Sequence, residues 1–129
     1  MRNVRPIRAL GAAVTSLALI VAIQAAWTVA SARPIQVTLR DGGIEPREID
    51  VLQGATVDIV VRNAGTQIHN FVVPDFYVFT QNLQPGETVR VSFVPDKTGK
   101  FRYYSDRDGI PEAGMQGTMR VESQAGTTS

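Results

Sequence analysis

The chain contains one histidine, His69, and no cysteine. Further along, the segment 105–112 supplies three carboxylates, from Asp106, Asp108 and Glu112. Imidazole nitrogen and carboxylate oxygen can bind Cu(II) or iron, so His69 with Asp106 or Asp108 is a candidate metal site. The same Asp-x-Asp-Gly pattern is also ordinary turn chemistry, in which carboxylates cap local backbone groups. The sequence alone leaves both interpretations open.

The absence of cysteine excludes several kinds of chemistry. Without a thiolate the chain cannot form disulfides, iron–sulfur clusters, cysteine-ligated zinc or a copper site that depends on sulfur charge transfer. A serine triad of Ser105, His69 and a nearby aspartate is conceivable. However, no Gly-x-Ser-x-Gly pattern or other nucleophile elbow accompanies these residues. We therefore expect that the protein is not an enzyme.

The elements that would position these residues are short strands. Apolar and polar residues alternate in runs that are separated by Gly, Pro and Asn, which is typical of an antiparallel sandwich or barrel. The runs are 35–40, 48–51, 56–62, 89–93, 101–104 and 119–121. Helical periodicity is not convincing between them. The pattern predicts an all-β domain.

The N-terminal part of the chain has the composition of a targeting segment. Three arginines before residue 9 precede an uncharged stretch, 9–32, that ends in Ala30-Ser31-Ala32. This pattern predicts a secretory signal peptide that is cleaved after Ala32. The stretch 9–32 is also long enough to span a bilayer, so an uncleaved anchor is the alternative.

These features divide the chain into three parts. We expect a signal peptide or anchor helix over 1–32, a folded domain over 33–122, and a flexible tail over 123–129. The protein would then be periplasmic or secreted, or held on the outer face of the cytoplasmic membrane by residues 9–32. After residue 32 there are ten basic and twelve acidic side chains. This balance argues against nucleic acid as a partner.

Several motifs, taken in order, resemble those of bacterial cupredoxins, as found in periplasmic proteins that handle copper and iron. They are the runs 44–57, 61–65 and His69-Asn70-Phe71 in the first half, and 83–87, 99–104 and 113–119 in the second half. The resemblance covers nearly all of 35–122. It implies a cupredoxin-like Greek-key β-sandwich.

In that family, copper is held by a histidine, a cysteine, a second histidine and an axial methionine. The resemblance assigns these positions to His69, Ser105, Ile110 and Met115, so the cysteine and the second histidine are missing. A blue copper centre needs the thiolate, and a neutral serine hydroxyl cannot replace it. The chain is therefore not expected to be a blue copper electron carrier. We expect Ser105 to point inward and to hydrogen-bond a loop backbone group.

Two hypotheses follow. In the first, a reduced, non-blue site at His69 and Met115, with Asp106 or Asp108, binds copper or, as a weaker candidate, iron. In the second, the domain holds no metal and binds another protein, or serves as an accessory to a membrane complex. The aromatic segment 74–79 is a candidate partner surface, because loops near a sandwich end often carry recognition. Its alternative role is a loop that folds over the core.

Overall fold

The computed structural model describes residues 33–124. The predicted signal peptide or anchor over 1–32 lies outside these residues, as does most of the predicted tail. Nine strands and one short 3₁₀ turn are found in the described part. They are β1 (Ile35–Arg40), β2 (Gly43–Glu45), β3 (Glu48–Leu52), β4 (Val57–Asn63), β5 (Val72–Val73), η2 (Pro74–Phe76), β6 (Val78–Phe79), β7 (Thr88–Phe93), β8 (Gly99–Arg107) and β9 (Ile110–Glu122). The prediction of an all-β domain is confirmed.

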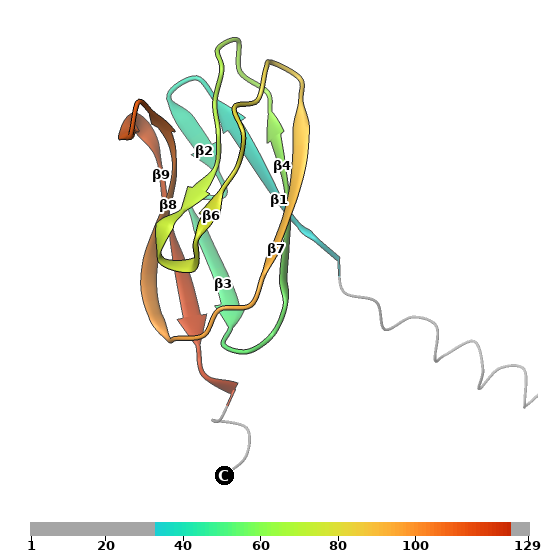
Figure 1. Ribbon diagram of the computed structural model, residues 1–129, viewed down its shortest axis with the longest axis vertical. Helices are drawn as coiled ribbons and strands as arrows, with labels where there is room; N and C mark the ends of the chain where they lie inside the picture. The colour runs from blue at the N-terminus through green and yellow to red at the C-terminus, as the bar shows by residue number, and fades with distance from the viewer. Residues whose placement is uncertain (1–32, 125–129) are drawn as a thin grey trace, which may run out of the picture. The chain divides into compact units, whose positions relative to one another are not determined.

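The strands form two sheets. One has the order β2-β1-β4-β7 and the other the order β3-β9-β8-β5-β6. Figure 1 shows β8 and β9 on one side of the folded unit and β4 and β7 on the other. The predicted antiparallel pairing holds for most strand pairs, but β1 pairs parallel to β4 and β3 pairs parallel to β9. Local alternation shows which residues share a face, but it carries no information on the direction of a distant partner strand.

The core lies between the two sheets and is built from the apolar positions of the alternating runs. On β4, Val57, Ile59 and Val61 are buried in alternation, as the sequence pattern requires. Tyr103, Met119 and Val121 contribute from the other sheet. Each such side chain stabilises the fold by about 1.5–3 kcal/mol when it leaves water. This core holds the loops at the ends of the strands in place.

The acidic segment 105–112 lies in a β-hairpin, and its Asp-Gly pair forms the turn. Strand β8 runs to Arg107 and β9 begins at Ile110, so only Asp108 and Gly109 form the turn. Both turn residues have positive φ, 53° and 82°. An Asp-Gly pair suits this tight two-residue turn because its left-handed backbone geometry costs these residues least. The β1–β2 turn, the β4–β5 loop and this hairpin gather at one end of the sandwich (Figure 1).

The aromatic segment 74–79 folds in part over the core, which was the alternative role expected for it. Phe76 is buried and its ring lies 4.8 Å from that of Phe101, centroid to centroid, so this part of the segment covers the core. Tyr77 and Phe79 are exposed. Among residues 33–124, no helix is long and apolar enough to cross a membrane.

Candidate functional site

His69 lies in the connection between β4 and β5 and is only 2% exposed. Its backbone pairs with that of Leu83 through two hydrogen bonds, of 3.2 and 2.7 Å. Asn63, at the end of β4, shapes this connection. Its amide nitrogen donates to the carbonyls of Gln67 and Leu83, and its amide oxygen accepts from the N–H of Gly65. The Asn-Ala-Gly turn of the sequence therefore fixes the backbone that carries the histidine.

Both ring nitrogens of His69 contact carboxylates. Nδ1 lies 2.8 Å from Oε2 of Glu112, and Nε2 lies 2.8 Å from Oδ1 of Asp41. An ionised carboxylate only accepts hydrogen bonds, so each nitrogen donates in this arrangement. Neither nitrogen keeps a free lone pair directed at an open space. We refer to Asp41, His69 and Glu112 as the carboxylate–histidine cluster.

Glu112 lies on β9 and has donors on both of its carboxylate oxygens. Its Oε2 accepts a second hydrogen bond from Ser105 Oγ, at 2.6 Å, and its Oε1 pairs with Arg107 at 3.0 Å. Burial raises the pKa of Glu112. The hydrogen bonds from Ser105 and His69 and the charges of His69 and Arg107 lower it by more. The net result is a carboxyl whose pKa lies below its ordinary value, so Glu112 is an anion at neutral pH.

Asp41 follows β1 and completes the cluster from the opposite side. Its carboxylate accepts from the Thr66 hydroxyl at 2.6 Å and from the backbone N–H groups of Thr66 and Gln67. The hydrogen bond from the Thr66 side chain, followed by that from His69, holds the pKa of Asp41 well below its ordinary value. Asp41 therefore connects the β1–β2 turn to the His69 loop.

Ser105 is fully buried on β8 and behaves as the sequence predicted. Its hydroxyl oxygen accepts a hydrogen bond from the backbone N–H of Asn70, at 3.1 Å. Its own proton is directed to the nearest acceptor, Glu112. Asn70 in turn binds Asp106 in two ways: its side-chain amide donates to the Asp106 carboxylate, and its side-chain oxygen accepts from the Asp106 N–H.

The four predicted metal-site residues are not joined by hydrogen bonds to one another. His69 and Met115 are buried, but Met115 belongs to the apolar core cluster. The Asp106 carboxylate is bound to Asn70, and Asp108 lies exposed in the hairpin turn. Within residues 33–124, no group of three or more His, Asp or Glu side chains has an arrangement suited to a metal ion.

The partners of His69 differ from those that the sequence favoured. In the sequence, Glu112 is one of three carboxylates in the segment 105–112, and residue type alone assigns it no role. Asp41 belongs to an Asp-Gly-Gly sequence, which on its own indicates only a turn. Asp41 and His69 are 28 positions apart. Only the parallel pairing of β1 with β4 brings these two segments together.

The residues present do not fit a blue copper ion. The position that the resemblance assigns to the thiolate is Ser105, and the position of the second imidazole is Ile110, whose side chain is 69% exposed. The only imidazole has carboxylates at both nitrogens. The donor set lacks the sulfur and the second nitrogen that define such a centre.

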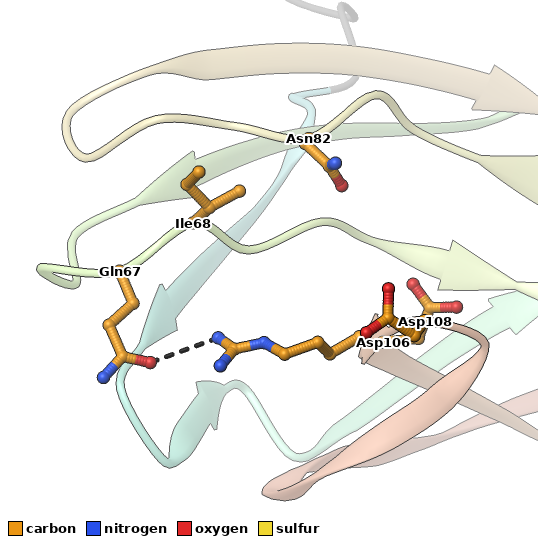
Figure 2. Close-up of a pocket in the computed structure, with 6 residues that line it drawn as sticks. Gln67, Ile68, Asn82, Asp106 and Asp108 are labelled. Atoms are coloured by element: carbon orange, nitrogen blue, oxygen red, sulfur yellow. Dashed lines mark hydrogen bonds between the residues drawn. The ribbon is translucent and has the colours of Figure 1, made fainter.

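An open pocket lies beside the cluster at the same end of the sandwich. It has a volume of about 400 Å³ and is lined by Gln67, Ile68, Asn82, Asp106, Arg107 and Asp108. Figure 2 shows the carboxylates of Asp106 and Asp108 at one side of it and Gln67 at the other. The guanidinium of Arg107 donates to Gln67 at 3.1 Å (dashed in Figure 2) while it pairs with Glu112. The pocket thus presents two carboxylates, and its one cation is already engaged.

Solved structures with the same fold include small blue copper proteins and parts of larger enzymes. Reduced auracyanin from Roseiflexus castenholzii matches with a TM-score of 0.61 and 18% identity, over 71% of this chain and 98% of auracyanin. Auracyanin A from Chloroflexus aurantiacus, a "blue" copper protein, matches with a TM-score of 0.55 and 20% identity, over 70% of this chain and all of auracyanin A.

The copper-containing nitrite reductase from Thermus scotoductus matches with a TM-score of 0.57 and 24% identity. The match covers 73% of this chain but only 28% of the reductase. At these identities the likeness establishes the fold. No curated protein matches the chain in sequence. The family model described as "Cupredoxin-like domain" matches residues 12–121, which is most of the chain. The protein therefore belongs to the cupredoxin-like domain family.

Proposed function

We propose that this protein is an exported cupredoxin-like module that works without a metal and acts by binding another protein. One observation carries the proposal: both nitrogens of its only imidazole are hydrogen-bonded to carboxylates, at 2.8 Å each. A metal ion at His69 would have to displace a proton and separate one of these pairs. The chain shares its fold with copper proteins, but it lacks the ligands that give those proteins their redox chemistry.

The same contacts argue against a catalytic role. A serine nucleophile needs a hydrogen bond to a base, in most cases a histidine nitrogen. Ser105 instead donates to Glu112 and is fully buried. His69 is enclosed by two carboxylates and cannot accept a proton from the hydroxyl. Neither residue is placed to attack a substrate.

The surface that we propose for partner binding is the end of the sandwich that holds the pocket. Two exposed apolar side chains, Ile68 and Ile110, lie at this end. A second cavity, lined in part by Ile110 and Pro111, shares Arg107 and Asp108 with the first. Exposed apolar side chains next to the carboxylates of Asp106 and Asp108 favour a partner segment that carries a basic residue beside an apolar one.

Site-specific photo-crosslinking in the producing cell tests this surface. A photoreactive residue at Ile110 should capture a discrete protein partner, whereas one at Lys100, on a different part of β8, should capture none. Crosslinking at Tyr77 in place of Ile110 would move the partner surface to the exposed aromatic segment. Absence of crosslinks at both Ile110 and Tyr77 would contradict a partner-binding role for either surface.

A copper titration tests the metal-free state. Wild-type protein should bind no stoichiometric Cu(II). Any residual affinity for Cu(II) should equal that of a His69→Ala variant. One equivalent of copper that is bound by the wild type and lost in His69→Ala would overturn the proposal. Metal analysis of the protein as purified from its cell should agree with the titration.

The second candidate function is the reduced, non-blue copper or iron site at His69 and Met115, with help from Asp106 or Asp108. Its support is membership of a family that is related to copper proteins, together with the burial of His69 and Met115. It requires Glu112 to leave His69. Copper binding that is lost in both His69→Ala and Met115→Ala would favour it.

Export is part of the proposal and has its own test. Mass spectrometry of protein from outside the cytoplasm should show an N-terminus at Arg33. Full-length chain in the membrane fraction would instead support an anchor formed by residues 9–32.

A further inference from the structure

The carboxylate of Glu112 lies at a meeting point of three segments. Its Oε2 is 2.8 Å from His69 Nδ1 in the β4–β5 connection and 2.6 Å from Ser105 Oγ on β8. His69 and Ser105 are two of the four positions that the resemblance assigns to metal ligands. The two positions therefore converge on one atom of this chain, an oxygen of Glu112.

The groups around that oxygen have the polarity that an anion requires. His69 Nδ1–H and the Ser105 hydroxyl donate to Oε2, and the guanidinium of Arg107 lies 3.0 Å from Oε1. The Glu112 side chain is only 13% exposed, so these donors replace most of its contact with water. A metal centre needs the opposite arrangement, with lone pairs directed at a cation.

We propose that Glu112 takes the place of the family's metal as an internal anion, and that the position has become an anion site. Glu112 is a positioning residue: it ties β8, β9 and the His69 loop together as a shared metal ion would. This inference rests on the proposed metal-free function. It identifies the group that fills the family's metal position as the Glu112 carboxylate, and it states that this group is an anion.

Chemical rescue tests the inference. Glu112→Ala removes the carboxylate and leaves the donors of His69, Ser105 and Arg107 around a space that a small carboxylate can fill. Sodium formate should raise the melting temperature of Glu112→Ala in a saturable way, relative to sodium chloride at equal ionic strength. It should leave the wild type unchanged, and also the matched control Asp108→Ala, which lacks an exposed carboxylate of the same hairpin.

Two results with a folded Glu112→Ala would overturn the proposal. One is no response to formate beyond that to chloride. The other is stronger stabilisation by Cu(II) than by formate, which would show a cation site. Copper binding by the wild type would instead contradict the proposed function. The formate result would still decide whether the empty position of Glu112→Ala accepts an anion.

A second variant keeps the test decisive if Glu112→Ala does not fold. Glu112→Gln retains the size of the side chain but loses its charge. The charge-assisted hydrogen bond from Ser105 Oγ to Glu112 is then weakened, so the hydroxyl is held less firmly. The backbone N–H of Asn70, which donates to Ser105 Oγ, should therefore exchange with solvent about tenfold faster than in the wild type. Formate should not reverse this change, because glutamine fills the space. An unchanged exchange rate would overturn the positioning role.

Discussion

Two side-chain pairs of this domain join neighbouring segments, one on the exposed surface and one in a buried position. Arg90 on β7 pairs with Asp58 on β4 on the outer face of a sheet, where the arginine side chain is 63% exposed. His69 pairs with Glu112 at the end of the sandwich, where the histidine side chain is 1% exposed. Water can replace the partners of the first pair but not those of the second. Only the buried pair should therefore contribute strongly to stability.

The largest effect is expected from His69→Ala. This change removes the imidazole that contacts Glu112 Oε2 through Nδ1. It also removes the contact of Nε2 with Asp41. Removing one partner of a buried pair should lower the free energy of unfolding by about 3 kcal/mol. Urea unfolding followed by the fluorescence of the aromatic residues measures this loss. A loss below about 1 kcal/mol would show that the buried cluster contributes no more to stability than an exposed pair does.

The next effect concerns the approach of the His69 loop to Asp41. A Cβ at Gly65 would collide with the Asp41 carboxylate, including the oxygen that contacts His69. Gly65→Ala should lower the free energy of unfolding by about 1–2 kcal/mol. Gly43→Ala is the matched control, because nothing lies within 4 Å of its added Cβ and its φ is not positive. Equal losses in the two variants would refute a specific role for this contact.

The pH dependence of stability should show the contribution of the buried cluster. The pKa of Glu112 is lowered in the folded state, so its contribution is present at neutral pH, above its unfolded-state pKa. That contribution is lost as the pH falls through its folded-state pKa. In Glu112→Gln, the decline of the unfolding free energy below about pH 5 should be shallower than in the wild type. Parallel curves from pH 7 to pH 3 would contradict this assignment.

The smallest effect is expected at the exposed pair. Arg90→Ala removes the guanidinium from Asp58, whose pKa is lowered mainly by the hydrogen bond from Arg90. Because the arginine is mostly exposed, the loss should be small and should shrink further in added salt. A loss as large as that of His69→Ala would overturn the contrast between the two regions.

Much of the fold could be predicted from local pattern. Alternating residues placed six strands, and the inward direction of Ser105 followed from its parity with Phe101 and Tyr103. The short strands β2, β5 and β6 were missed, because two or three residues are too few to show a period of two. The parallel pairings were missed because they depend on strands distant in sequence.

The site was predictable only in part, for a related reason. His69 and the carboxylate-bearing hairpin stood out by residue type, and the resemblance directed attention to Ser105. The choice among three carboxylates depended on the direction of each side chain along β8 and β9, and a bulge between Tyr104 and Asp106 shifts that register. Asp41 lies directly after the first strand of the domain, and its only local signal was that of a turn.

We propose that the imidazole of His69 is held by two carboxylates and is closed to metal ions. Because His69 is the only histidine, its ring gives the only imidazole signals in a ¹⁵N–¹H spectrum of the protein. We predict protons on both Nδ1 and Nε2, each shifted downfield by its carboxylate, and no change when Cu(II) is added. A ring with one bare nitrogen, whose signals broaden in proportion to added copper, would contradict the account.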